Sequence, residues 1–485
     1  MIDGMKYSCP RIVVYAFATS AYFFSEVIKR SRELVEWSII IPRGHHLDEL
    51  RGLVPAERLL YLYECFNKDY LRQPDISDFV FPEQGDNFSY SLLKDKDGYR
   101  HLDKDEQLRR IAVVYQTYRR FLEEVRPEYV LFPDLEVVDG FVLINLCQEL
   151  GITPIYHVGM RSLGGSFFAQ NAEERLPVYF GTEGVAEMAV AADYVRQVSE
   201  AGRVIPLAGA EVVKVAPPRP KNSFVRRVVN NLWLAFTKER YYSGEDNFWL
   251  NCLTLVRHQL NALRRLWFKT WQVRFFDLVE KGAVLPQRFV YYALQYTPES
   301  SINGLMPYYV DQMRAIDRLL IGLPHGFRLL VKEHPAMMGV RDSAFYRQLR
   351  RRPGVVLVAP WVDSAQLIQK ASLIASVTGT VGLESFLLDR PCCLFGKTFF
   401  SHLCYPAEEW MTRPGWISEL LADYQAPSFE EKVREIAKLL AIRFDFELAD
   451  PFAVPAVLAP DNVERFLSAL LRHLQLIKHS QEPAT

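Results

Sequence analysis

Four short segments of this 485-residue chain place polar side chains directly after an apolar run: residues 133–136, 295–301, 332–335 and 378–384. Ligands of open α/β sheets bind beyond the carboxyl ends of the strands. Residues that follow a strand are therefore the first candidates for chemistry. Each segment also has a structural interpretation as an ordinary turn, and the two interpretations have to be weighed together.

The segment Lys332-Glu333-His334-Pro335 follows the apolar run FRLLV. Lys332 is a fixed cation, and His334 can donate a hydrogen bond to a phosphate or protonate a leaving oxygen. Pro335 would end the strand and stiffen the turn that holds the imidazole. A solvated charge cluster at a strand end is an equally good interpretation of this segment by itself.

The segment 378–384, TGTVGLE, is expected between a strand and a helix. Its small residues allow the backbone to approach a ligand, and a helix N-terminus offers free N–H groups to phosphate. The candidate donor-binding residues here are Thr378, Gly379, Thr380, Gly382 and Glu384. Glu384 suits a ribose diol better than an anion. A capping carboxylate is the alternative, although it lies four rather than three residues after Thr380.

The other two segments are weaker signals. Gln295 and Glu299 lie in the turn QYTPESS that opens the second half of the chain, where a helix start is the simpler interpretation. Asp134 and Glu136 form the best-placed carboxylate pair of the first half, and a sugar-transfer reaction needs a carboxylate or an imidazole near the reacting centre. An acidic turn that caps the next helix through Asp139 is at least as good an explanation.

The elements that would position these residues alternate between strand and helix, which predicts parallel, doubly wound sheets. Strands are expected at 11–18, 38–42, 128–133, 154–158, 288–294, 327–331, 355–358, 373–377 and 392–395. Helices are expected at 104–126, 139–150, 182–201, 307–320, 364–370, 382–388, 430–442 and 462–477.

Residues 219–274 differ from both halves. They contain 11 Lys and Arg against three Asp and Glu, together with many aromatic residues. Apolar positions 249, 253, 256, 260, 263, 267 and 271 follow steps of three and four, which predicts an amphipathic helix. We expect two inserted helices here. They would either lie on an anionic membrane surface or pack on each other or on a partner protein.

Bulk properties exclude several classes of protein. The formal net charge of −1 gives no reason to expect a nucleic-acid partner. The seven cysteines include no CxxC pair, so we expect no metal and no cofactor. The first 20 residues do not look like a signal peptide, and no apolar run reaches the length of a spanning helix. The expected location is cytoplasmic, peripheral on the inner face of the membrane.

Three segments together resemble one family: LQYTPESS at 294–301, VKEHPAMMG at 331–339 and SVTGTVGLESFLLDRPCCLFGKTFF at 376–400. Their order and content are similar to the C-terminal half of bacterial capsule-polysaccharide synthesis proteins, which include Kdo transferases. In that family His334-Pro335 would match the motif at the donor phosphate. Thr378, Gly379 and Thr380 would match the small-hydroxyl loop, Glu384 the acid at the ribose, and Gln295 and Glu299 the turn that reaches the donor.

The resemblance implies a GT-B fold, in which two Rossmann-like domains face each other across a cleft. The helical insert is expected from the basic segment and is not required by the resemblance. We expect an N-terminal acceptor domain at 1–214, the insert at 215–285 and a donor domain at 286–485. The implied activity is transfer of a sugar, with Kdo as one candidate, from a CMP-activated or other nucleotide sugar to a glycan or lipid-linked glycan. The alternatives are polyol-phosphate transfer from a CDP donor and a non-catalytic scaffold.

Overall fold

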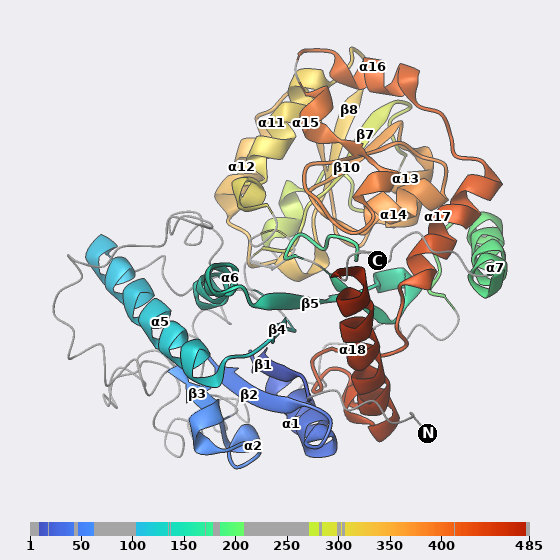
Figure 1. Cartoon of the computed structure of the whole chain (residues 1–485). Coiled ribbons are helices and arrows are strands. Elements are labelled where there is room, and N and C mark those ends of the chain that lie inside the picture. The colour runs from blue at the N-terminus through green and yellow to red at the C-terminus, as the bar shows by residue number, and fades with distance from the viewer. Residues whose placement is uncertain are drawn as a thin grey trace, which may run out of the picture. The chain divides into compact units, whose positions relative to one another are not determined.

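The computed structural model describes residues 9–17, 19–42, 47–62, 103–133, 135, 137–169, 171–177, 185–207, 271–280, 284–297, 302, 306–411 and 413–481. These residues form two α/β units, each built on a six-stranded sheet (Figure 1). The first unit contains residues up to 180 and the chain from 442 onward, and the second contains 181–208 and 219–441.

The sheet of the first unit has the strand order β3-β2-β1-β4-β5-β6. All neighbours are parallel except β5 and β6, which form an antiparallel pair. The bounds are β1 Arg11–Tyr15, β2 Glu36–Ile41, β3 Leu59–Tyr61, β4 Tyr129–Phe132, β5 Thr153–Gly159 and β6 Ser166–Ala169. In the central strands β1 and β4 every residue except Arg11 is buried, as expected of a sheet covered on both faces.

The described residues of the first unit form five helices: α1 Ser20–Ser31, α2 Leu47–Leu50, α5 Lys104–Val125, α6 Val138–Leu150 and α18 Pro460–Gln481. Gly151 ends α6 in the left-handed conformation, which glycine adopts readily. Phe23 and Phe24 of α1 meet Phe466 of α18 edge-on, with ring centroids 5.1 and 5.8 Å apart. The last helix of the chain therefore helps to bury the first.

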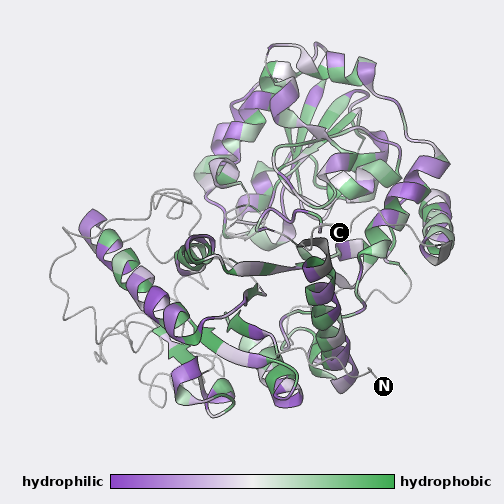
Figure 2. Cartoon of the chain, in the orientation of Figure 1, coloured by the Kyte–Doolittle hydropathy of each residue, from purple (hydrophilic) through white to green (hydrophobic). Residues whose placement is uncertain are grey.

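The sheet of the second unit has the order β12-β11-β10-β7-β8-β9, with every pair parallel. Its strands are β7 Phe289–Ala293, β8 Arg328–Lys332, β9 Val355–Val358, β10 Leu373–Ser376, β11 Cys392–Leu394 and β12 Tyr405–Pro406. Figure 2 shows these strands mostly in green, with purple residues on the surrounding helices.

In the part of the second unit that the structure describes, the helices are α7 Val185–Ala201, α11 Met313–Gly322, α12 Ser343–Arg350, α13 Ser364–Lys370, α14 Val381–Leu387, α15 Ala407–Trp410, α16 Trp416–Asp423 and α17 Phe429–Ala441. In Figure 1, α11 and α12 lie on one side of the strands and α13 and α14 on the other. The sheet is thus doubly wound.

The expected fold class, two doubly wound Rossmann-like sheets of the GT-B type, is confirmed. The bounds of the two units differ from the expected domain boundaries at three places. The helix α7 packs against α17 in the second unit, the chain from Ile442 packs in the first, and 271–280, expected in the insert, belong to the second unit. Most of the expected insert, residues 215–270, lies outside the described residues.

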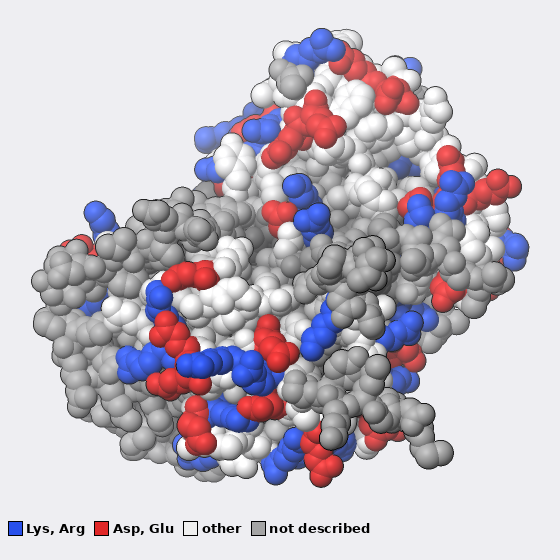
Figure 3. Space-filling view, in the orientation of Figure 1, with Lys and Arg blue, Asp and Glu red and all other residues white. Residues whose placement is uncertain are grey.

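Charged side chains are mixed on the face shown in Figure 3, where blue and red atoms alternate. This pattern agrees with the near-zero net charge of the whole chain. None of the helices that the structure describes is long and apolar enough to cross a membrane.

Candidate functional site

The second sheet reverses its strand order between β7 and β10, since the chain proceeds from β7 to β8 and β9 on one side and continues in β10 to β12 on the other. Such a switch point is where open α/β sheets bind ligands. Ala293 lies opposite Lys332, and Tyr292 lies opposite Ala375. The residues that follow β7, β8 and β10 therefore emerge together at one edge of the sheet.

Gln295 connects the turn after β7 to the turn after β10. In the amide orientation that satisfies both of its ends, Oε1 accepts from the backbone N–H groups of Thr378 and Gly379 at 2.7 Å each, and Nε2 donates to Thr378 Oγ1 at 3.2 Å. A Cβ on Gly379 would lie 2.5 Å from Ser376 Oγ. The glycine therefore lets this turn fold closely over the end of β10.

The rest of the 378–384 segment has mixed roles. Thr378 is buried, whereas Thr380 is exposed at the start of α14. A Cβ on Gly382 would lie 2.8 Å from the Phe400 ring and 3.1 Å from Cys404 Sγ. The structure thus explains Gly382 by the packing of α14 rather than by approach to a ligand.

Glu384 turns back toward the start of its helix, where its Oε1 accepts from Thr380 Oγ1 at 3.2 Å. Burial raises the pKa of this carboxyl group, and the Thr380 hydroxyl and the Lys332 charge act in the opposite direction. Lys332 is buried at the end of β8, and its Nζ donates to Ser364 Oγ at 2.7 Å. Burial lowers the pKa of Lys332, while the charges of Asp363 and Glu384 raise it.

Glu333 points to the opposite face and is enclosed by protein groups. Its carboxylate accepts from Arg341 Nε at 2.7 Å, from the Tyr346 hydroxyl at 2.6 Å and from the His334 backbone N–H at 2.6 Å. Its side chain is fully buried. This geometry makes Glu333 a structural clamp under the turn that carries His334.

His334 caps the 3₁₀ helix Pro335–Met337, and its Nδ1 accepts from the Ala336 backbone N–H at 3.3 Å. A neutral imidazole held in this way carries its proton on Nε2, which is then a donor. The ring is half-buried, and its centroid lies 5.9 Å from that of the Tyr296 ring. Pro335 is the first residue of the 3₁₀ helix, a position that suits proline.

Three expected site residues lie outside the described residues: Glu299, Asp134 and Glu136. In the first unit, the structure describes His157 on β5. Its Nε2 lies 2.9 Å from Ser166 Oγ and its Nδ1 lies 3.4 Å from the Pro133 carbonyl. Burial lowers the pKa of His157 to about 4, so it is a neutral core histidine.

Several residues of the site carried no signal in the sequence. Gln312 is fully buried, and its amide binds both the N–H and the carbonyl of Gln295, at 2.8 and 3.1 Å. Arg341 donates to the same carbonyl at 2.9 Å. Lys397 is exposed directly after the Phe395-Gly396 continuation of β11, next to the turn after β10. Gln312 and Arg341 lie in no motif, and Lys397 lies inside the segment 376–400 but was not singled out there. The pairing of the strands brings these residues to the edge.

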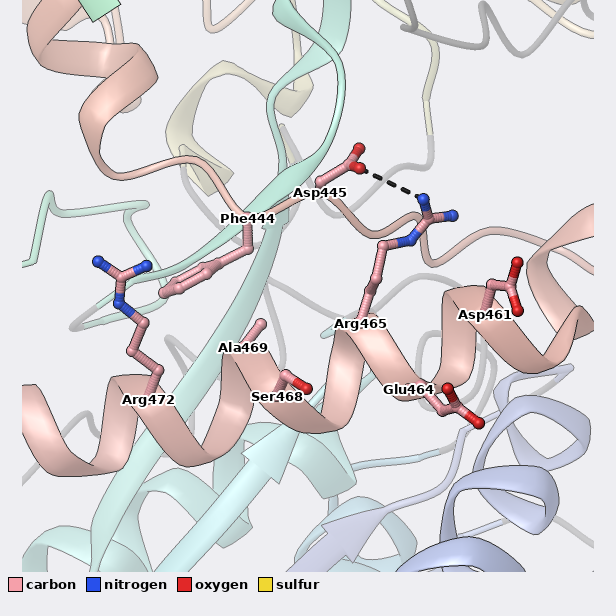
Figure 4. A pocket seen from close by; sticks show the side chains of 8 residues that line it. All are labelled: Phe444, Asp445, Asp461, Glu464, Arg465, Ser468, Ala469 and Arg472. Carbon is pink, nitrogen blue, oxygen red and sulfur yellow. Dashed lines mark hydrogen bonds and ion pairs between the residues drawn. The ribbon is translucent and has the colours of Figure 1, made fainter. Parts of the chain in front are cut away.

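A separate hollow of about 440 Å³ lies along α18 in the first unit, where Arg472 and the Arg465–Asp445 ion pair line it (Figure 4). Asp461 and Glu464 on the same helix add negative charge. With both signs of charge in one shallow surface hollow, it favours no class of ligand. The edge of the second sheet remains the candidate site.

Residues 251–404 match the family model described as capsule polysaccharide biosynthesis protein. This match confirms the resemblance to the capsule-synthesis family. The matching segment contains every donor-site candidate from Gln295 to Glu384, as well as Lys397. A search of curated proteins gives no match.

Several solved structures align with this chain at low identity. The Thermosulfurimonas dismutans KpsC beta Kdo 2,4 transferase is 13% identical, with a TM-score of 0.33, over 61% of this chain and 79% of that chain. The Methanocaldococcus jannaschii UDP-GlcNAc 2-epimerase, in complex with UDP-GlcNAc and UDP, is 11% identical, with a TM-score of 0.26, over 89% and 99%. These likenesses are too distant to carry over a substrate or a reaction.

Proposed function

We propose that this chain is a glycosyltransferase of capsular or surface polysaccharide synthesis that uses a nucleotide-activated sugar, with a CMP-sugar as the favoured donor. The observation that carries the proposal is the meeting of Gln295, His334 and the 378–384 turn at the switch point of the second sheet. All of them lie in the segment that matches the capsule-synthesis family. The acceptor is a glycan or a lipid-linked glycan.

Each group at the edge has a part in donor binding. Nε2–H of His334 donates to the phosphate of the donor and stabilises the charge that grows there as the sugar leaves. The Glu384 carboxylate accepts hydrogen bonds from the ribose diol. Gln295 does not need to touch the donor, because its amide already holds the Thr378 and Gly379 backbone that shapes the site.

Transfer then needs a group that activates the acceptor. An acceptor hydroxyl oxygen forms a bond to the anomeric carbon as the bond from that carbon to the phosphate oxygen breaks. The electron pair of the broken bond leaves with the nucleotide, and the hydroxyl proton passes to a carboxylate. Asp134 and Glu136 are the candidates that the sequence offers for this base.

Two measurements test the proposal. Purified protein is incubated with CMP-Kdo, UDP-sugars or CDP-glycerol and with a lipid-linked glycan fraction, and nucleotide release is followed. Release from a CMP-sugar is expected, whereas release from CDP-glycerol alone would favour polyol-phosphate transfer. In a thermal-shift comparison we expect CMP to stabilise the protein more than UMP or AMP. No response to any nucleotide and no release from any donor would leave the scaffold as the better explanation.

A further inference from the structure

Residues 271–280, where the basic segment 219–274 ends, are attached to β9 at the edge of the second sheet. The backbone N–H groups of Asp277 and Leu278 donate to the Leu357 carbonyl at 2.9 and 3.1 Å, and the Leu357 N–H donates to Asp277 Oδ2 at 2.8 Å. Leu278 also forms a parallel bridge with Val358. This segment covers the otherwise open edge of β9, so residues 271–280 are part of the second unit.

Gln272 is the polar residue of this segment that is buried in the unit, with 1% of its surface exposed. Its Nε2 donates to the Arg341 carbonyl at 2.7 Å, and its Oε1 accepts from the Gly339 N–H at 2.8 Å. Gly339 has a φ of 80°, which favours glycine. One amide thus fixes both sides of the turn that leads from the His334 region into α12.

Arg341 transmits this constraint to the site. Its guanidinium donates to Glu333 and to the Gln295 carbonyl, and therefore joins the end of β8 to the turn after β7. The aromatic neighbours of Gln272 act on the same cluster, because Phe275 stacks on Tyr346, which donates to Glu333. The path from Gln272 to Gln295 consists of packed, directly hydrogen-bonded groups.

We propose that Gln272 is a positioning residue of the donor site, which acts through Arg341 on the turns that carry His334 and Gln295. This proposal rests on the proposed function, because only that function makes the edge of the second sheet a donor site. It adds to the donor site a residue that lies outside all three motifs, where the basic segment joins the second unit. Gln272 itself forms no hydrogen bond with His334 or Gln295, so its effect on them is indirect.

The test replaces Gln272 with Met, which keeps the length of the side chain and removes both hydrogen bonds. Gln348→Met is the matched control, because Gln348 is exposed on α12 in the same unit. Hydrogen–deuterium exchange is measured for peptides that cover residues 294–297, 333–341 and 376–380, with β2 of the first unit as the internal reference. CMP affinity is measured on the same proteins.

For Gln272→Met we expect faster exchange at the three turns, unchanged exchange in β2, and about tenfold weaker CMP binding, within the range that mutations along packed networks produce. The control should match the wild type in both measurements. Unchanged exchange at the turns, or an equal increase in every part of the protein, would overturn the proposal.

The two proposals fail in different ways. If the wild type binds no nucleotide, the donor assignment fails, and the exchange data still decide whether Gln272 positions the turns. If Gln272→Met does not fold, Gln272→Asn, which keeps the amide and shortens its reach, is measured instead. The same exchange pattern is expected from it, and wild-type exchange at the turns would count against the proposal.

Discussion

At the scale of single residues, His334 is the side chain whose geometry points most directly to chemistry. Its Nδ1 accepts from the Ala336 N–H, which places the proton of a neutral ring on Nε2. Because loss of one such donor at a transition state costs about 10²–10³ in turnover, we expect a decrease of that size for His334→Ala. His325→Ala is the matched control, since His325 is exposed in the turn before β8. Initial rates of nucleotide release are measured for both variants. Near-wild-type turnover of His334→Ala would mean that the turn at 332–335 has only a structural role.

Glu384 and Lys332 predict a pH dependence of donor binding. The ionised form of Glu384 accepts hydrogen bonds from the ribose, so CMP affinity should fall as the pH drops through its raised pKa. The Lys332 charge lowers that pKa, and Lys332→Met should therefore move the midpoint of this fall to higher pH. Affinity is measured by calorimetry from pH 4.5 to pH 8 for both proteins. A midpoint that stays or moves to lower pH would contradict the assigned interaction.

Lys397 offers a test of the edge itself. As an exposed cation beside the turn after β10, it should attract the anionic donor, and Lys397→Gln should weaken binding by about fivefold at low salt, the upper range for an exposed ion pair. Lys370→Gln removes the same charge from the last residue of α13. This control should keep wild-type affinity. Equal effects of both substitutions would mean that only the net charge matters.

The sequence predicted the residues that form motifs and missed those that support them. Lys332, His334 and Thr378 do lie at the carboxyl edge of one sheet, as the strand ends indicated. Gln272, Gln312 and Arg341 were not predicted, because a buried polar residue has no local pattern. Its partners are defined only after distant segments pack together, and Gln272 and Arg341 are 69 positions apart.

At the scale of elements, the buried pair Arg341–Glu333 supports the turns after β7 and β8. Arg341→Met would leave the Glu333 carboxylate buried without its cation, which costs about 3–5 kcal/mol in comparable cases. We therefore expect a lower melting temperature of the second unit, which calorimetry measures. Arg413→Met is the control, because Arg413 pairs with Glu419 at 2.7 Å on the surface, with side chains 67% and 47% exposed. A control that destabilises as much would argue against burial as the cause.

Element prediction succeeded where an apolar run or a helical period was long enough. The strand at 355–358 and the helix at 364–370 have the expected bounds. The helix expected at 307–320 is in fact a 3₁₀ turn, Pro307–Val310, followed by α11 from Met313. The interruption places Gln312 under the Gln295 turn, a tertiary requirement that periodicity does not encode. The helix α12 was not predicted, although it is one residue longer than the helix at 364–370 that was.

At the scale of the whole molecule, chain order does not decide which core an element joins. The last helix, α18, buries Val463, Phe466 and Leu470 in the first unit. The helix α7 falls within the expected first domain, 1–214, but packs on α17 in the second unit. A sequence pattern shows that a helix has an apolar face, and only the folded structure shows which sheet that face covers.

The basic segment gives a prediction at this same scale. Residues 219–274 carry 11 basic and three acidic side chains, and the sequence predicts amphipathic helices with tryptophans at positions 249, 267 and 271. Basic amphipathic helices of this kind lie in the headgroup layer of anionic membranes. A lipid-linked acceptor would give such a tether a purpose, because the tether would bring the protein to an acceptor held at the membrane. Packing of the stripe on itself or on a partner protein is the competing explanation.

Flotation with vesicles separates these explanations, and the structure determines how the deletion has to be designed. Gln272 and residues 275–278 are part of the second unit, so the deletion must stop before residue 271. A variant with a short Gly-Ser linker in place of 219–268 keeps that attachment. The intact chain should float with anionic vesicles, each Lys or Arg near the surface contributing about 1 kcal/mol, and binding should fade as salt rises. The linker variant should stay in the soluble fraction and keep its CMP affinity. If both proteins stay in the soluble fraction at low salt, the segment packs on protein instead.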